Sequence, residues 1–208
     1  EPVKLLTAKA SPFGRKVWMA ILHCGLGESI PQVDANPFNT EDALHAHNPL
    51  GKVPALVLDD GTALAESAVI MQYLDLSSGG RLLPAEPHAR IRELELQALA
   101  DGVMEAAALI VGEKRMRPAE KWHLPWVEYQ RAKIARTLAV LAKDPPPPER
   151  VQAASLALAA ALGFLDRRGQ YAWREAQPSL VPWLEHFRAA CPAFDATHQP
   201  PEPGWTSL

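Results

Sequence analysis

Hydrophobic and polar positions follow two different patterns along the chain, and the change falls near residue 80. Before it, short apolar runs alternate with helical periodicity, which predicts a strand over residues 3–6, a helix over 12–24, a strand near 30–33 and a short helix from Glu41. After it the strand signals vanish. We therefore predict an α/β domain over residues 1–79, a linker over 80–85 and an all-helical domain over 86–208.

A hairpin and a helix complete the first part. Residues 55–58 form an apolar run, Asp60-Gly61 is a strong turn signal, and residues 63–65 resume the apolar pattern, which predicts an antiparallel hairpin. Ser67 precedes apolar residues at helical spacing, so we expect it to be the N-cap of a helix that ends near residues 77–80.

Four longer helices are predicted in the second part, over residues 88–116, 126–142, 153–165 and 179–190. The third is apolar on all sides, so we expect it to run through the middle of a bundle. It is well short of the ~20 residues that a membrane-spanning helix needs.

Glu66 and Ser67 together suit the two charged ends of an amino acid. A ligand carboxylate can dock on the open N–H groups of a helix N-terminus, and Glu66 can take an amine. Pro54 begins a strand, where a cis bond would expose the backbone of Val53 for pairing with an extended peptide. Each feature alone is more often structural, as a cap, a turn or a strand stop.

Composition narrows the range of partners. The formal charge of −3 and a pI near 6.2 give no electrostatic footprint for nucleic acid or an anionic membrane, so a small-molecule partner fits better. The only cysteines, Cys24 and Cys191, form no CxxC pair, and no metal-ligand spacing is evident. The start of the chain has neither a basic leader nor a long apolar core, so we expect a cytosolic protein.

Three segments carry a resemblance to a known family: ASPFGRKV at 10–17, NPLGKVPAL at 48–56 and LAESAVIMQYL at 64–74. On these segments the chain resembles the cytosolic glutathione S-transferases, in a serine-type bacterial subgroup similar to the YibF-like proteins. Weaker likeness continues at ALADGVMEA (98–106), RPAE (117–120) and ALGFLD (161–166).

The resemblance implies a thioredoxin-like N-terminal domain, an all-helical C-terminal domain, and a cytoplasmic homodimer that uses glutathione as co-substrate and no metal. It implies that Glu66-Ser67 hold the γ-glutamyl end of glutathione and that Val53, before the cis-proline Pro54, pairs with the cysteinyl backbone. Lys52 would lie near the glycyl carboxylate, and Phe13 would line the site.

Ser11 is the catalytic candidate that the resemblance implies. Thiolate is the reactive form of a thiol, and a hydroxyl that donates to it lowers the thiol pKa. Ser11 is equally well placed as the N-cap before Pro12, and Thr7 is the reserve candidate. Because no cysteine lies at this turn, a mixed-disulfide mechanism of the glutaredoxin kind is disfavoured.

The predicted function is transfer of glutathione to small hydrophobic electrophiles, with peroxide reduction, dehalogenation, isomerisation and ether cleavage as neighbouring chemistries. The alternative is a non-catalytic glutathione-binding or interaction protein of the same fold. The electrophile would lie between the domains, near Phe13, with Met104, Leu109 and Trp122 as candidates, and Arg115 could face the same cleft.

One departure from the family concerns the central helix. Relatives begin it with a Ser/Thr-x-x-Asp capping box, whereas residues 152–155 read QAAS. We therefore expect a missing box, at a cost of about 1 kcal/mol.

Overall fold

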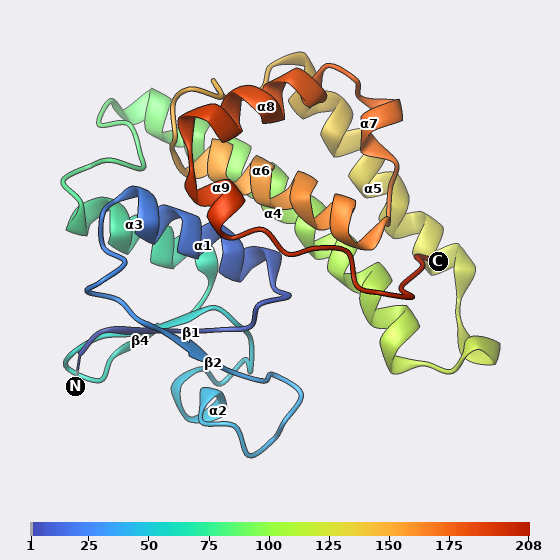
Figure 1. Ribbon diagram of the computed structural model, residues 1–208, viewed down its shortest axis with the longest axis horizontal. Coiled ribbons are helices and arrows are strands. Elements are labelled where there is room, and N and C mark those ends of the chain that lie inside the picture. The colour runs from blue at the N-terminus through green and yellow to red at the C-terminus, as the bar shows by residue number, and fades with distance from the viewer. Residues whose placement is uncertain (1) are drawn as a thin grey trace.

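The computed structural model describes residues 2–208 as a small sheet region followed by a helical region (Figure 1). The sheet has the order β2-β1-β3-β4, in which β1 (Lys4–Thr7) runs parallel to β2 (Gln32–Asp34) and antiparallel to β3 (Ala55–Val57). The predicted hairpin is confirmed, since β3 pairs antiparallel with β4 (Ala63–Leu64).

Three helices cover this sheet. Figure 1 shows α1 (Pro12–His23) and α3 (Ser67–Ser77) on one side and α2 (Leu44–His47) on the other. Leu5 and Leu56 of the sheet are fully buried against apolar side chains of the same core cluster, among them Val17 of α1 and Ile70 of α3. This layering is the predicted thioredoxin-like region.

The rest of the described chain is helical. Its elements are α4 (Pro87–Met116), the 3₁₀ turn η1 (Ala119–Lys121), α5 (Leu124–Lys143), α6 (Ala153–Arg168), α7 (Trp173–Ala176), α8 (Leu180–Ala190) and α9 (Ala193–Ala196). The four long helices match the predicted ones. The short η1, α7 and α9 were not predicted, because a single turn shows no periodicity.

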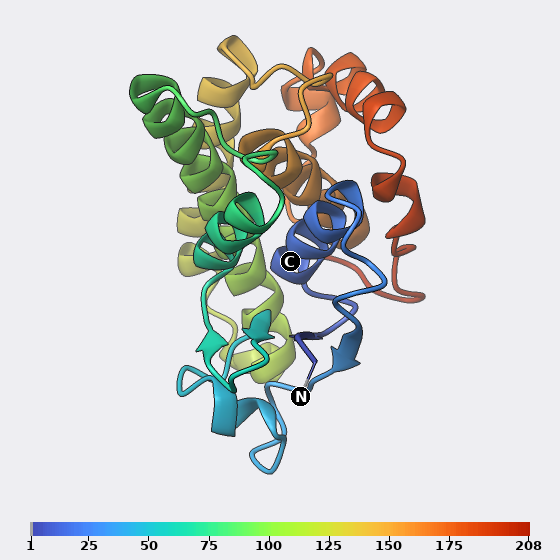
Figure 2. The same ribbon diagram turned by 90° about the vertical axis from the view of Figure 1, so that its left-hand side faces the viewer.

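α6 lies at the centre of the helical region and is buried along nearly all its length, as its composition predicts. In the view of Figure 2, turned by 90°, it again lies inside the other helices. Its Leu156, Leu158 and Leu162 have no exposed surface.

The expected loss of the capping box at α6 is wrong, because Ser155, the third helical residue, accepts the N-cap N–H as the acidic residue of such a box would. The Gln152 N–H donates to Ser155 Oγ at 3.0 Å, and the Ala153 N–H donates to the Leu82 carbonyl at 2.9 Å. The Ala154 N–H donates to Glu93 Oε1 of α4 at 2.8 Å. The open N–H groups of the first turn are therefore satisfied partly from a neighbouring helix and from the segment before α4.

Asp75 fixes that segment against α3. Its Oδ1 accepts the N–H groups of Leu82 and Leu83, both at 2.9 Å, and Arg90 of α4 lies 3.3 Å from Oδ2. Leu82 is fully buried. The predicted linker is thus a packed connection that ties the two regions together.

Replacing Glu93 tests whether its carboxylate caps the first turn of α6. Glu93→Leu keeps the volume but leaves the buried Ala154 N–H unpaired, so it should lower the free energy of unfolding by about 1–3 kcal/mol. Glu93→Gln keeps an acceptor oxygen and should stay within about 1 kcal/mol of the unmodified protein. Chemical denaturation of both variants measures this, and equal losses would refute the cap.

The same residue makes a pH prediction. Burial raises the pKa of the Glu93 carboxyl above the 4.5 of a free glutamate. As the pH rises past 4.5, the Glu93 carboxyl therefore loses its proton in the unfolded chain before it does so in the folded one. The free energy of unfolding falls over this range, because deprotonation favours the unfolded state, where the carboxylate is exposed to water. The stability of Glu93→Gln relative to the unmodified protein should rise from pH 4 to pH 7, and a constant difference would contradict this.

Candidate functional site

Ser11 is the N-cap of α1. Its backbone is extended, with φ −75° and ψ 120°, and its Oγ accepts the N–H of Gly14 at 3.1 Å. A hydroxyl oxygen that accepts a hydrogen bond still carries an O–H that can donate. The cap and a role toward a thiolate therefore use different parts of one group, and the two interpretations of Ser11 do not compete.

Thr7 is packed beneath the first turn of α1. It is 5% exposed, and a Cβ added to Gly14 would lie 2.2 Å from its Oγ1. The absence of a side chain at Gly14 is what allows the helix to approach β1 this closely. Ser11 is only half-buried and lines a pocket, so it is more accessible to a ligand than Thr7.

The backbone before β3 is shaped by Asn48. This buried side chain accepts the Leu50 N–H at 3.0 Å and donates to the Lys52 carbonyl at 2.9 Å, and the Val53–Pro54 peptide bond that follows is cis. Sequence reasoning assigned Asn48 no role. Its position four residues before Lys52 in a turn is the signal that could have found it.

The start of α3 differs by one residue from the prediction. Ser67 is the first helical residue and is 5% exposed, and Glu66 is the N-cap, so the expected N-cap role of Ser67 is wrong. Glu66 makes no side-chain cap hydrogen bond, which leaves the first N–H groups of α3 without a side-chain partner. Such a terminus favours an anionic ligand group.

Glu66 is also the one described non-glycine residue with a positive φ, at 62°. This backbone conformation costs about 1–3 kcal/mol, and it persists only where surrounding structure maintains it. The Glu66 carboxylate lies 3.8 Å from Lys52 Nζ, and both side chains are more than half exposed. An exposed pair of this kind contributes little to stability, so both groups remain available to a ligand.

Behind these groups lies a buried ion pair that sequence reasoning missed. Lys16 Nζ of α1 lies 2.8 Å from Asp101 Oδ1 of α4, and Lys16 is fully buried. Burial lowers the pKa of Lys16 and raises that of Asp101, and the contact between them opposes both shifts. The pair joins the two regions directly behind the first turn of α1.

A pocket opens beside Ser11 between the two regions, with a volume of about 20 Å³. This is room for one compact group and not for an aromatic ring. It is lined from the sheet region by residues 9–12 and Arg15, from α6 by Ala160, Gly163, Phe164 and Arg167, and from the C-terminal segment by Gln199.

The residues expected at an electrophile site do not converge on this pocket. Met104 is fully buried in the core, Leu109 is 47% exposed, and the Trp122 indole donates to the Arg117 carbonyl beyond the end of α4. Phe13 packs against the core cluster. None of these four side chains lines the pocket beside Ser11.

Arg115 belongs to a different contact. It pairs with Glu202 at 3.1 Å and stacks near the Trp205 ring, so it fixes the C-terminal segment.

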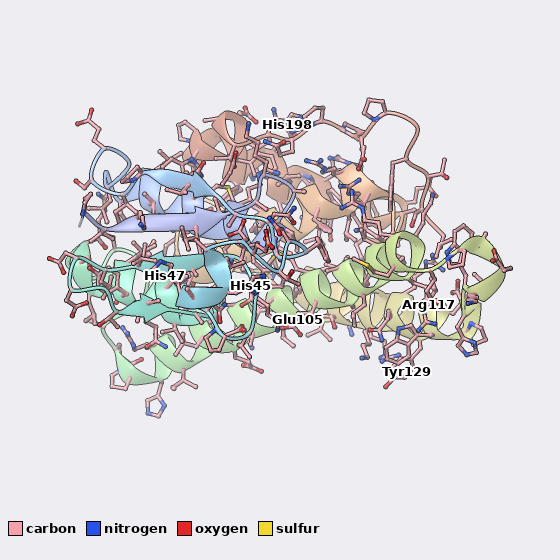
Figure 3. The ribbon with its side chains drawn as sticks, turned by 90° about the horizontal axis from the view of Figure 1, so that it is seen from below. His45, His47, Glu105, Arg117, Tyr129 and His198 are labelled. Carbon is pink, nitrogen blue, oxygen red and sulfur yellow. The ribbon has the colours of Figure 1, made fainter. Side chains whose placement is uncertain are left out.

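A second hollow, lined by Arg117 and Trp126 among others, lies beyond the end of α4. Figure 3 shows Arg117 and Tyr129 at one end of the molecule and His45 of α2 toward the other end. Glu105 of α4 lies between these two places.

Among residues 2–208, no three His, Cys, Asp or Glu side chains are arranged to hold a metal ion. Across the same residues, every helix is too short or too polar to cross a membrane.

Comparison with known proteins adds a consistent result. The family described as "Glutathione S-transferase, N-terminal domain" matches residues 10–76. The chain is 33% identical over 191 residues to the uncharacterized GST-like protein YibF of Escherichia coli K12, covering 89% of this chain and 93% of that protein.

Solved structures of glutathione transferase family members share the fold of this chain. A glutathione transferase family member from Pseudomonas fluorescens Pf-5, with bound glutathione, superposes with a TM-score of 0.88 at 37% identity, covering 96% of this chain and 100% of that one. A second structure from that organism, with bound S-(propanoic acid)-glutathione, gives a TM-score of 0.84 at 36% identity, covering 95% and 100%.

The positive φ of Glu66 makes a stability prediction that needs no ligand. Glycine adopts this conformation freely, whereas alanine does not, so Glu66→Gly should be more stable than Glu66→Ala by about 1 kcal/mol. Thermal unfolding of the two variants, which lack the same carboxylate, measures the difference. An alanine variant as stable as the glycine variant would show that residue 66 does not hold this backbone.

Proposed function

Because the chain belongs to the glutathione S-transferase family, we propose that it activates the thiol of glutathione for attack on small electrophiles with a hydrophobic body. The observation that carries the proposal is the hydrogen bonding of Ser11. Its oxygen accepts the Gly14 N–H at the start of α1, and its O–H remains to donate into a pocket that both regions line.

In this proposal the open N-terminus of α3 receives the γ-glutamyl carboxylate of glutathione at Ser67, and Glu66 receives its amine. Val53 pairs with the cysteinyl backbone and Lys52 lies near the glycyl carboxylate. Phe13, which is partly buried against the core, contributes only through its exposed part on the first turn of α1. Support comes from the exposed Glu66 and Lys52 side chains, the cis bond after Val53 and the glutathione bound in the Pseudomonas relative.

The chemistry asked of the protein is to favour the thiolate. A free thiol with a pKa of about 8.5 is mostly protonated at neutral pH, whereas the thiolate is the nucleophile. The Ser11 O–H donates to the sulfur, and the positive end of the α1 dipole adds to the effect. The thiol proton passes to solvent as the thiolate forms. The sulfur then bonds to the electrophilic carbon, and the leaving group departs with the electron pair of the bond that breaks.

One of the Pseudomonas structures holds S-(propanoic acid)-glutathione, a ligand with a substituent on the glutathione sulfur. For this chain, that supports a site that accepts a conjugate as well as glutathione. An interaction protein of the same fold needs no such space, whereas a glutathione- or ligand-binding carrier, the other alternative, would share it with a transferase.

A cytoplasmic homodimer is the proposed state. Both cysteines are free and buried, which suits a reducing compartment that supplies glutathione. Val69, Tyr73 and Leu76 share one stripe of α3 by helical spacing, and Leu76 is 78% exposed. An apolar stripe of this kind suits a contact between two copies of the chain.

Titration of bound glutathione tests the role of Ser11. The thiol pKa of bound glutathione, followed by thiolate absorbance, should lie below the free value of about 8.5 and rise by about one unit in Ser11→Ala, equivalent to about 1.4 kcal/mol. Ser11→Thr keeps the hydroxyl and should keep most of the shift.

Ser11→Gly separates this role from the cap. Glycine at an N-cap costs only a few tenths of a kcal/mol, whereas alanine costs about 1. The pKa should therefore rise equally in both variants while only Ser11→Ala loses stability. Glutathione bound with an unshifted pKa would indicate a carrier, and no affinity for glutathione in the unmodified protein would refute both functions.

Light scattering tests the dimer. The particle mass should be twice the 22.7 kDa of the chain, and Leu76→Asp should reduce it to the monomer by placing charge in an apolar contact. Leu124→Asp changes a side chain that is 56% exposed on α5 and serves as the matched control. A monomeric unmodified protein would refute the dimer.

A further inference from the structure

The pocket beside Ser11 is rich in positive charge although the chain as a whole is acidic. Lys9, Arg15 and Arg167 are among the residues that line it, and its lining includes no Asp or Glu. The chain carries a formal charge of −3. Ser11 also caps α1, so the positive end of a helix dipole adds to the same field.

Arg167 differs from the arginines around it. Arg168 and Arg115 both pair with Glu202, and Arg174 pairs with Asp166. Among the described residues, no carboxylate lies within ion-pair distance of Arg167. Within residues 2–208, its one hydrogen bond is to the Gln199 amide oxygen at 3.3 Å, and its buried Nε has no partner there.

Arg15 forms the wall of the pocket. Its Nε donates to Thr197 Oγ1 at 3.0 Å and its second guanidinium nitrogen to the Phe194 carbonyl at 2.6 Å, so it is held by neutral oxygens. A Cβ on Gly163 would come within 2.5 Å of this guanidinium. The missing side chain at Gly163 is what lets Arg15 reach the pocket.

The charges of both arginines are incompletely compensated. Burial lowers the pKa of Arg15 to about 10, and the charge of Asp195 opposes this shift only in part. Burial together with the nearby Arg168 lowers the pKa of Arg167, and the charge of Glu202 opposes that shift. Lys9 adds an exposed ammonium at the rim. A bound anion would offset the cost of burying these cations, and the carboxylate is the planar anion that a guanidinium binds best.

We propose that this pocket is the electrophile subsite and that it selects electrophiles with a compact anionic group, a carboxylate above all, held by Arg167 and Lys9 with Arg15 behind them. The proposal rests on the glutathione-transferase function. The apolar side chains of Pro12, Ala160 and Phe164 receive the carbon body next to the charged group.

The step that this arrangement serves can be written for chloroacetate. The glutathione sulfur bonds to the methylene carbon, the carbon–chlorine bond breaks, and chloride leaves with the bonding pair. The thiol proton goes to solvent, and the product is S-(carboxymethyl)glutathione. Chloroacetamide reacts in the same way and differs only in having a neutral amide where chloroacetate has a charge.

A second explanation of the cations is that they serve the thiolate alone. In both conjugates the sulfur is an uncharged thioether, so cations that act only on the thiolate would not distinguish the conjugates. Affinity for the two conjugates therefore separates the explanations, and it needs no turnover.

The test is calorimetric titration of the full chain with glutathione, S-(carboxymethyl)glutathione and S-(carbamoylmethyl)glutathione. The carboxymethyl conjugate should bind about tenfold more tightly than the carbamoyl conjugate. Arg167→Gln should bring the ratio near one while glutathione affinity changes less than twofold. Arg136→Gln removes the same charge from an exposed position on α5 and should leave the ratio unchanged.

Lys9→Gln is the second variant, because Lys9 is exposed and its substitution should leave the fold intact. It should reduce the ratio in part, and chloroacetate turnover relative to chloroacetamide should follow the same order of variants. Two outcomes would overturn the anionic subsite and leave the proposed function standing. In the first, the protein binds glutathione but has equal affinity for the two conjugates. In the second, the ratio of conjugate affinities is unchanged by both substitutions. Absence of glutathione binding overturns both.

Discussion

The structure depends on a buried ion pair between two helices that are far apart in the sequence. Lys16 and Asp101 are 85 positions apart, and Lys16 Nζ lies within 3.0 Å of both Asp101 oxygens. Two charges removed from water stabilise a fold only while they face each other, and removing either one costs about 3–5 kcal/mol. The pair therefore specifies one orientation of α1 against α4. Ser11 and Arg15 lie on that same helix turn or next to it, so their directions are set together with it.

The site is divided between the two regions according to the chemistry each supplies. The sheet region presents backbone and short side chains at the cis bond after Val53, at the first turn of α3 and at Ser11. These groups suit a ligand of constant structure. α6 and the C-terminal segment supply Arg167 and Gln199, long side chains at the far wall of the pocket. Under the proposed function, this division would let one wall recognise glutathione while the other wall determines which electrophile reacts with it.

Local patterns predicted most of the fold, and non-local contacts account for what was missed. The hairpin follows from Asp60-Gly61 between apolar runs, and α6 follows from a long apolar segment. The cap that Glu93 gives to α6 joins residues 61 positions apart, and no local signal marks it. The pocket was missed for the same reason, since Arg167 and Gln199 come together only because the C-terminal segment packs against α6. The candidates taken from apolar character, Met104 above all, were absorbed by the core, because a large apolar side chain fits a core as well as a ligand site.

Gly163 determines how close the Arg15 guanidinium can come to α6. The residue lies on α6, packs against the Arg15 guanidinium and is remote in sequence from every group proposed to hold glutathione. A single methyl group there would displace Arg15 and change the charge and shape of the pocket, while the cis bond after Val53, the α3 terminus and Ser11 would be untouched. Under the proposed function, a substitution at this one position would therefore change which electrophiles fit, while the groups proposed to hold glutathione stay in place.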